Sequence, residues 1–413
     1  MPSHFTRNIT EDFILNIQNA PVTLLNGARQ TGKSTLLKDL QKQGIISEYL
    51  TLDDLQTQAL LLESPIQFLE KLPVGTAIDE IQRLPEVFLS IKKVVDDNRV
   101  AGRFILSGSA NVMALPKLAD SLAGRMQINT LYPLSFGEKN GVRENFVDWA
   151  FDHQSKLERQ KIEQIDWEEK VLTTGFPQSN NMTGKVLENW YQGYETTLIQ
   201  KDVKALSDIE KLGYLPKLLR LTAGRVASTI NYSDLARSLE ISNMSVKRYL
   251  ELLKALYLIV EIPAWSGNYT KRLTKSPKIF FADNGFLGYQ LGLDKNYLLQ
   301  RREVFGSMLE NMIATEIIKQ ISWSDTRPKI FHFREVLGEE IDLILENRRG
   351  EMVAIEVKSS SRIKSEHLQN LKKFKAKMGD QVVKSILLYT GTQIELLGDD
   401  MVALPINRMF EEF

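Results

Sequence analysis

The stretch that most constrains this chain is a glycine-containing loop between an apolar run and a helical pattern. The apolar run covers residues 21–26, and the helical pattern follows from Leu36. Glycines at both ends of such a loop let its backbone N–H groups converge on an anion at the positive end of the helix. The loop fits the phosphate-binding pattern G-x-x-x-x-G-K-[ST] and reads Gly27-Ala28-Arg29-Gln30-Thr31-Gly32-Lys33-Ser34-Thr35.

The last residues of the loop carry the groups that a bound nucleotide needs. The Lys33 ammonium can reach the β- and γ-phosphates, and the Ser34 hydroxyl can ligate Mg²⁺. A chance glycine-rich turn is the alternative, but the strand before the loop and the helix after it are the context that phosphate binding requires. All nine residues are therefore predicted to form a nucleotide site.

Strand and helix patterns continue to alternate after the loop, up to about residue 135. The predicted strands cover residues 49–53, 76–80 and 103–107, and the predicted helices cover 65–72 and 85–96. Such alternation is typical of a parallel sheet with helices on both faces. We therefore expect an α/β domain in residues 1–135.

Two acids, Asp79 and Glu80, end one of these strands. A carboxylate at this edge can hold Mg²⁺, so Asp79 is a candidate metal ligand, while Glu80 can orient or deprotonate the attacking water. Ser107 and Ser109 follow the next strand, where a polar side chain can sense the γ-phosphate, although a plain turn fits both equally well. Arg125 is a candidate arginine finger, acting on a neighbouring subunit, or else a solvated arginine at a helix end.

The order of these motifs resembles a bacterial and archaeal group of AAA-superfamily P-loop ATPases. The matching runs are GARQTGKST, AIDEIQ, LSGS and SLAGR followed by LYPLSFGE, then residues 175–177, 194–195, 202–203 and 355–360. The second half of this group is catalogued only as a domain of unknown function. The resemblance implies ATP as the ligand and ATP hydrolysis as the activity, and a homo-oligomer is expected. It implies little about the biological task.

The composition excludes several classes of site. There is no cysteine, which excludes disulfides and thiolate metal sites and suits a reducing cytoplasm. The N-terminal residues lack the apolar core of a signal peptide, and no apolar run reaches the length of a membrane span. A cytoplasmic protein without a membrane partner is expected. Its formal net charge is zero, so any nucleic-acid surface must be local.

A local basic excess marks the middle region, residues 136–300. Residues 201–278 contain 14 Lys and Arg against 7 Asp and Glu. Two helices, at 232–239 and 243–256, are predicted with Ser233 and Ser242 as their caps, and two strands follow at 257–262 and 278–281. Helix, helix and two strands are the order of a winged helix.

In a helix-turn-helix, the amino-terminal part of the second helix enters the major groove. The basic segment 269–275 is the candidate wing, suited to phosphate contact. Nucleic acid, DNA rather than RNA, is therefore a candidate partner. A lid that contacts protein, or a merely solvated basic face, remains the alternative. The candidate contact residues are Ser245, Lys247, Arg248, Lys271 and Arg272.

The C-terminal region, residues 301–413, predicts a helix, three strands, a helix and a strand. The order αβββαβ resembles the core of PD-(D/E)xK nucleases. Asp342 interrupts an apolar strand, and Glu356 and Lys358 share one face of the next strand. Glu310, from the first helix, can join them.

Together Glu310, Asp342 and Glu356 could hold Mg²⁺ or Mn²⁺, with Lys358 stabilising the developing charge. The sequence thus favours an ATPase coupled to a metal-dependent nuclease-like domain acting on DNA. The alternative is an ATP-regulated DNA-binding or assembly protein whose nuclease-like domain is a non-catalytic scaffold, with a structural ion pair in place of the metal.

Overall fold

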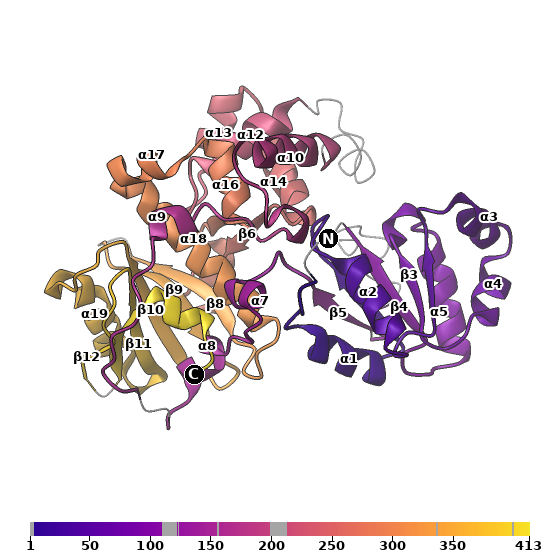
Figure 1. Cartoon of the computed structure of the whole chain (residues 1–413), viewed down its shortest axis with the longest axis horizontal. Coiled ribbons are helices and arrows are strands. Elements are labelled where there is room, and N and C mark those ends of the chain that lie inside the picture. The colour runs from indigo at the N-terminus through magenta and orange to yellow at the C-terminus, as the bar shows by residue number, and fades with distance from the viewer. Residues whose placement is uncertain are drawn as a thin grey trace. The chain divides into compact units, whose positions relative to one another are not determined.

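The computed structural model describes residues 4–109, 122, 124–154, 157–198, 213–335, 338–398 and 400–413. These fall into two compact units, which contain the separate sheets seen in Figure 1. The N-terminal unit comprises residues 1–134, 176–213 and 249–258, and the C-terminal unit comprises 135–175, 214–248 and 259–413. In this division one boundary falls between Leu134 and Ser135, and residues 259–413 stay within one unit.

The N-terminal unit is built on a five-stranded parallel sheet of order β2-β3-β4-β1-β5. Its central strands are apolar and buried on both faces, as expected where helices cover a parallel sheet on both sides. The strands are β1 (Val22–Asn26), β2 (Glu48–Thr51), β3 (Thr76–Asp79), β4 (Phe104–Gly108) and β5 (Met126–Thr130).

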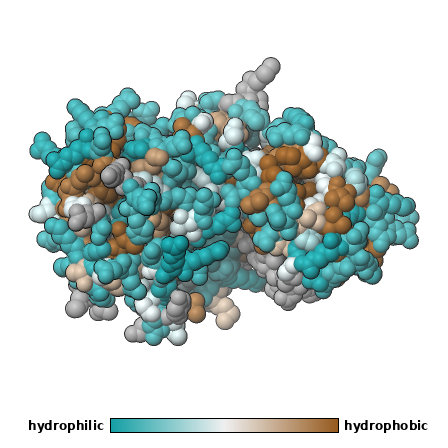
Figure 2. Space-filling model, turned by 90° about the horizontal axis from the view of Figure 1, so that it is seen from below, coloured by the Kyte–Doolittle hydropathy of each residue, from teal (hydrophilic) through white to brown (hydrophobic). Residues whose placement is uncertain are grey.

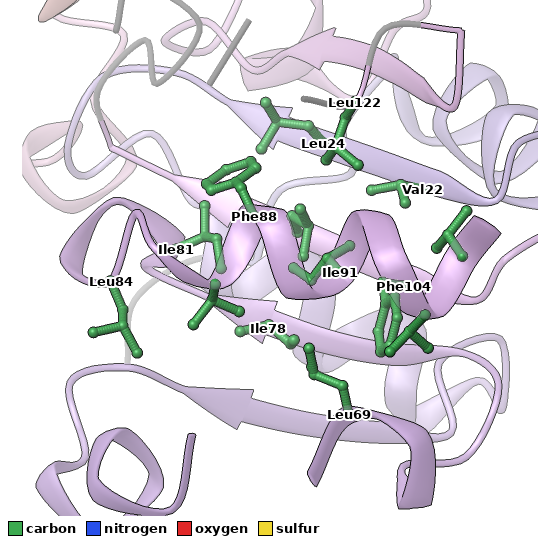
Figure 3. Packing of buried hydrophobic residues seen from close by; sticks show 14 of the residues in the cluster. Val22, Leu24, Leu69, Ile78, Ile81, Leu84, Phe88, Ile91, Phe104 and Leu122 are labelled. Carbon is green, nitrogen blue, oxygen red and sulfur yellow. The ribbon is translucent and has the colours of Figure 1, made fainter. Parts of the chain in front are cut away.

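Two apolar clusters, one on each face of the sheet, fix the helices of this unit. In Figure 3, Val22, Leu24, Ile78 and Phe104 of the strands meet residues of α4 and α5, among them Leu69, Phe88 and Ile91. The other cluster joins Leu25, Ala77 and Ile105 to α1 and α2. The helices are α1 (Thr10–Asn19), α2 (Lys33–Lys42), α3 (Leu55–Glu63), α4 (Pro65–Lys71), α5 (Val87–Asp97) and α10 (Gly184–Thr197).

The elements α1, α3, β5 and α10 of this unit were not predicted from the sequence, and two of them show why. Helix α3 begins at an Asp54 cap, whose carboxylate accepts hydrogen bonds from the backbone N–H groups of Gln56 and Thr57. Strand β5 is an edge strand with Gln127 and Ile128 exposed, so it lacks the continuous apolar run that marks a central strand. Strand β5 is therefore defined by its neighbours rather than by its own periodicity.

The C-terminal unit contains a six-stranded sheet of order β12-β13-β11-β10-β9-β8. Strands β8, β9 and β10 are antiparallel, and β10, β11 and β13 are parallel. The strands are β8 (Lys329–Arg334), β9 (Glu340–Glu346), β10 (Met352–Lys358), β11 (Val382–Tyr389), β12 (Glu395–Leu396) and β13 (Met401–Pro405). With helices α18 (Arg302–Ile321) and α19 (Gln369–Met378), the predicted order of helix, three strands, helix and strand is present.

The middle of the chain has the predicted order of two helices and two strands, preceded by a helix that was not predicted, α12, and two details differ. The elements are α12 (Tyr214–Ala223), α13 (Tyr232–Leu239), α14 (Asn243–Ala255), β6 (Ile259–Ile262) and β7 (Lys278–Phe281). Ser242 caps α14 as predicted, but the cap of α13 is Asn231 rather than Ser233, because the Asn231 side chain accepts from Asp234 N–H. The predicted wing contains a short helix, α15 (Tyr269–Thr274).

The segment after β6 is anchored to the C-terminal sheet. The Trp265 N–H donates to the His332 carbonyl of β8 at 2.6 Å, and the His332 N–H donates to the Pro263 carbonyl at 3.0 Å. The Trp265 ring is buried with Phe333 and Phe374. These contacts attach residues 263–265 to the sheet of the C-terminal unit.

Short helices complete the C-terminal unit, namely α7 (Phe136–Asn140), α8 (Phe146–Phe151), α9 (Trp167–Lys170), α16 (Asn284–Leu291) and α17 (Lys295–Gln300). The visible surface in Figure 2 is mainly hydrophilic, with separate hydrophobic patches. Across the described part of the chain, no helix combines the length and the apolar character needed to cross a bilayer.

Candidate functional site

The predicted phosphate loop joins β1 to α2, as its pattern requires. Gly27 has φ +144°, and a Cβ there would lie 2.2 Å from the Leu131 carbonyl oxygen. Gly32 has φ +99° and immediately precedes the first residue of α2. No other residue type fits the first position, and the second needs a left-handed backbone. Both glycines therefore serve the loop geometry that the sequence predicted.

Lys33 lies at the amino end of α2, with its side chain turned back over the loop. Its Nζ donates to the carbonyl oxygens of Gly27 and Ala28, at 2.9 and 2.8 Å. A phosphate group placed in this loop would offer the same ammonium stronger, charged acceptors. The lysine ammonium thus lies against the loop that the sequence predicts to bind phosphate.

A cleft of about 1000 Å³ opens over the loop, and every residue lining it belongs to the N-terminal unit. Loop residues 29–35 form one side of it, and Glu80 also lines it. Residues 4–7 and α10 supply further walls, the latter with Trp190 and Tyr194, whose rings stack with centroids 5.2 Å apart. The volume lies within the range of small-molecule sites.

Arg7 supports the loop and was missed by the sequence analysis. Its guanidinium donates to the Thr31 and Tyr132 carbonyl oxygens, both at 2.7 Å, and the residue is buried. These hydrogen bonds tie the loop to the segment after β5. No local pattern could have identified Arg7, because its partners lie 24 and 125 residues further along the chain.

Asp79 ends β3, and donors hold both of its carboxylate oxygens. The Ser107 hydroxyl at the end of β4 and the Glu80 N–H donate to Oδ1, the latter at 3.0 Å. The Tyr49 hydroxyl of β2 donates to Oδ2. Ser107 was one of two candidates for sensing the γ-phosphate, and in the structure its hydroxyl contacts Asp79.

Tyr49 is the second site residue that the sequence analysis missed. Burial, together with its hydrogen bond to the Asp79 carboxylate, raises the pKa of Tyr49 above its ordinary value, while a hydrogen bond with the Ser34 side chain acts in the opposite direction. The Tyr49 phenol therefore binds one of the two groups predicted to hold Mg²⁺, the Asp79 carboxylate. Ser34 and Asp79 are oxygen donors of the kind that Mg²⁺ binds, so this pair fits the ion.

Glu80 has a left-handed backbone, with φ +59°, directly after the strand. Its carboxylate accepts hydrogen bonds from the Gln82 amide and, at 3.4 Å, from the Ser109 hydroxyl. Ser109 therefore lies beside the predicted catalytic base, while Ala110 and Asn111 of the same predicted turn lie outside the described residues. The turn separates the two acids: Asp79 is buried, and Glu80 lines the cleft.

Arg125 lies at the amino-terminal end of strand β1, whereas the phosphate loop follows the carboxyl-terminal end. Its carbonyl accepts from Val22 N–H at the start of β1. Its guanidinium binds the Asp96 carboxylate, with one contact of 3.0 Å. It therefore cannot act on the phosphates of its own subunit without a large movement, and a role on a neighbouring subunit stays a prediction.

The four predicted nuclease-like residues converge in the C-terminal unit. Asp342 of β9 accepts a hydrogen bond from the Val357 N–H of β10 at 2.8 Å. Lys358 Nζ lies 2.7 Å from Glu356 Oε2, and the buried Glu356 Oε1 has no hydrogen-bond partner among the described residues. Burial, and next the charge of Asp342, raise the pKa values of Glu356 and Glu310 to about 8.

A residue that the sequence analysis assigned only to a strand, Lys278 of β7, enters this cluster. Its Nζ lies 2.9 Å from Glu310 Oε1 and 2.8 Å from Glu340 Oε1. Across the described residues, no group of three or more His, Asp or Glu side chains is arranged to hold a metal ion. The predicted set Glu310, Asp342 and Glu356 therefore does not fit a divalent metal in this arrangement.

The predicted nucleic-acid residues separate into two groups. Lys247 and Arg248 are exposed near the amino end of α14, and the Ser245 hydroxyl is hydrogen-bonded to Ser242. Arg272 of α15 instead binds Glu346 and lies over the Trp265 ring, 5.1 Å from its centroid. Its prediction as a nucleic-acid contact is wrong, because this guanidinium is engaged inside the unit. The Lys271 side chain lies outside the described part of the structure.

Three family models match consecutive parts of the chain. Residues 19–140 match an AAA domain. Residues 164–297 match a domain of unknown function (DUF8612), and residues 305–409 match another (DUF4143). The matching runs at 121–125 and 202–203 include residues outside the described structure.

Curated relatives match over most of the chain. Uncharacterized proteins of Mycobacterium tuberculosis and Mycobacterium bovis are 26% identical over 394 residues, covering 95% of this chain and 82% of theirs. An uncharacterized protein of Haemophilus influenzae is 25% identical over 320 residues, covering 72% of this chain and 74% of its own.

Solved structures also align with the chain. A Walker-type ATPase of Pyrococcus abyssi is 18% identical, covers 70% of this chain and 96% of its own, and has a TM-score of 0.42. The RuvB Holliday junction branch migration motor of Thermotoga maritima is 18% identical, with coverages of 62% and 89% and a TM-score of 0.27. The AAA match, together with the loop and the strand-end acids, supports a P-loop ATPase in residues 19–140.

Proposed function

We propose that this protein binds ATP in the cleft of the N-terminal unit and hydrolyses it with the help of Mg²⁺. One observation carries the proposal: Glu80 lines the same cleft as loop residues 29–35, directly beside the buried Asp79. In this arrangement Asp79 can hold the Mg²⁺ ion, and Glu80 can activate the attacking water. The test is ATP hydrolysis by purified protein, compared with the Glu80→Gln variant.

Each residue has a defined part in this reaction. Lys33 and the loop N–H groups bind the β- and γ-phosphates, and Ser34 with Asp79 would hold Mg²⁺, which neutralises phosphate charge. Glu80 accepts a proton from water as the water oxygen bonds to the γ-phosphorus and the bond from that phosphorus to the bridging oxygen breaks. ADP leaves with the electron pair of that bond, and Ser107 keeps Asp79 in position.

Tyr49→Phe is expected to tighten the binding of Mg²⁺ in the presence of ATP by about tenfold. The Tyr49 hydroxyl donates to Asp79, so it competes with the ion for that carboxylate. A hydrogen bond to a charged group contributes about 1.5–3 kcal/mol, and about 1.4 kcal/mol corresponds to tenfold. Calorimetric titration of Mg²⁺ into the ATP complex measures the effect, with the exposed Tyr297→Phe as the control.

A weaker Mg²⁺ affinity in Tyr49→Phe would contradict this competition. It would mean that the phenol supports the bound ion, for example through a water molecule. An unchanged affinity would mean that Tyr49 leaves the site when ATP binds. Titrating Tyr49→Phe beside wild type and Tyr297→Phe distinguishes a tighter, a weaker and an unchanged Mg²⁺ affinity.

We propose further that ATP controls an assembly that binds nucleic acid, DNA rather than RNA, with the C-terminal sheet acting as a scaffold. The exposed Lys247 and Arg248 near the start of α14 support nucleic-acid binding, because a second helix of this type presents its amino end to the groove. The Lys278 ammonium, which lies among the carboxylates of Glu310, Glu340 and Asp342, supports the scaffold role. Metal-dependent cleavage is the second candidate, favoured by Asp342, Glu356 and Lys358 lying on adjacent strands.

Replacing Lys247 and Arg248 by glutamate is expected to weaken DNA binding by at least about tenfold, with the basal ATPase rate unchanged. Phosphate contacts make affinity fall steeply with salt, and each lost contact reduces that slope by about one. Fluorescence anisotropy with duplex DNA at several salt concentrations measures both quantities. The matched control is Arg348→Glu with Arg349→Glu, an identical charge change on an exposed turn of the same unit.

Salt-insensitive or absent DNA binding by the wild type would instead favour the lid that contacts protein. Cleavage is tested separately, by incubating the wild type with DNA or RNA in Mg²⁺ or Mn²⁺, with and without ATP. Cutting that is lost in Asp342→Ala would support the second candidate over the scaffold.

A further inference from the structure

A lysine side chain lies among the carboxylates where a metal ion was predicted. The Lys278 side chain is only 3% exposed, and its Nζ is within 2.9 Å of Glu310 and 2.8 Å of Glu340. Asp342 Oδ1 lies 3.9 Å away. One ammonium group thus faces three acids, drawn from α18 and β9.

Lys278 reaches this position because of where it lies in β7. It pairs with Ile262 of β6 at the start of a strand whose four residues are all buried. An isolated ammonium in such a place costs several kcal/mol, so it requires charged partners. Burial lowers the pKa of Lys278, but the carboxylates of Glu310, Asp342 and Glu340 outweigh it and hold the pKa above its ordinary value.

The remaining carboxylate groups of the predicted site are engaged through one oxygen each, while Glu356 Oε1 has no hydrogen-bond partner among the described residues. Glu356 Oε2 accepts from the Lys358 ammonium, and Asp342 Oδ2 accepts from the Val357 N–H. A divalent ion would need oxygen atoms from several acids at about 2.0–2.6 Å. Two of the three predicted ligands, Glu310 and Glu356, are instead within hydrogen-bond distance of lysine ammonium groups.

We propose that the Lys278 ammonium is the resident cation of this site, taking the place of a divalent metal. It binds β7 to α18 and β9 and keeps the site closed to Mg²⁺ and Mn²⁺. Removing this positive charge turns Glu310, Glu340 and Asp342 into a site for a hard divalent cation. The inference rests on the proposed scaffold role of the C-terminal sheet and is independent of ATP hydrolysis.

The test is Mn²⁺ binding to the full-length chain without nucleotide, counted by electron paramagnetic resonance of the free ion. Wild type and Lys278→Arg are expected to bind no Mn²⁺ that depends on Asp342. Lys278→Met is expected to bind about one further Mn²⁺ per chain that wild type does not bind. That binding should be lost when Asp342→Asn is added, and Mn²⁺ should raise the melting temperature of Lys278→Met alone.

Two results would overturn the proposal. The first is stoichiometric Mn²⁺ binding by wild type that Asp342→Asn or Glu356→Gln abolishes. The second is a folded Lys278→Met protein that gains no Mn²⁺ site. If Lys278→Met does not fold, the comparison of wild type with Asp342→Asn still decides the first point. ATP hydrolysis, followed in the same preparations, should be unchanged, so a failure of the proposed ATPase would be seen separately.

Discussion

Lys33→Ala is expected to weaken ATP binding by about 100-fold and to reduce hydrolysis to background. The Lys33 ammonium donates to the loop carbonyls, within reach of a phosphate. Alanine removes this ammonium and its contact with the phosphates. A charge-assisted contact contributes up to about 3 kcal/mol, which corresponds to about 100-fold in affinity. Titration with a fluorescent ATP analogue measures binding, and release of inorganic phosphate measures turnover.

Glu80→Gln separates binding from chemistry in the same assays. It keeps the buried Asp79 and removes only the charge that accepts a proton, so ATP should bind normally while kcat falls by about 10²–10⁴-fold. Lys93→Ala, which removes an exposed lysine ion-paired to Asp97 on α5, is the control and should match wild type. Equal hydrolysis by wild type and Glu80→Gln would show that another group activates the water.

Trp265→Ala is expected to lower the free energy of unfolding of the C-terminal unit by about 3–5 kcal/mol, the usual cost of truncating a buried tryptophan. The ring packs against Phe333 and Phe374 with centroids 6.2 and 6.0 Å away, and Arg272 lies over it. Truncation would leave a cavity in the sheet's core and remove the apolar surface beneath that guanidinium.

Urea unfolding followed by far-ultraviolet circular dichroism measures this loss, and hydrogen exchange of β8 and β9 assigns it to the correct unit. The second measurement is needed because a chain with two units need not unfold in one step. Leu273→Ala on α15 is the control, since that side chain is 88% exposed. A stability equal to wild type would mean that residues 263–265 add nothing to the sheet that they border.

The features whose place in the fold could be predicted from the sequence are those defined by neighbours along the chain. The phosphate loop depends on glycines five residues apart, and the acids Asp79 and Glu80 end an apolar strand. The convergence of Asp342, Glu356 and Lys358 followed from the alternation of side chains in adjacent strands. In each case, the local sequence pattern determines where the residues lie in the fold.

The features that were missed depend on contacts between distant residues. Tyr49 lies 30 residues from Asp79, and Lys278 lies 32 residues from Glu310. A lysine at the start of a short strand gives no sign that it is buried, because solvated lysines also begin strands. Arg272 was misassigned for a related reason: its basic neighbours suggested a wing, whereas Glu346 and Trp265 engage its guanidinium.

The left-handed backbone at Glu80 has a consequence for how this protein could change under selection. A residue other than glycine in that conformation costs about 1 kcal/mol or more, so glycine would relieve the strain at this position. Glycine would also remove the carboxylate from the cleft. Selection for folding alone would therefore favour the change Glu80→Gly, and only selection for turnover would keep the acid. Copies of this fold released from catalysis should lose their glutamate here early, while they still keep the phosphate loop.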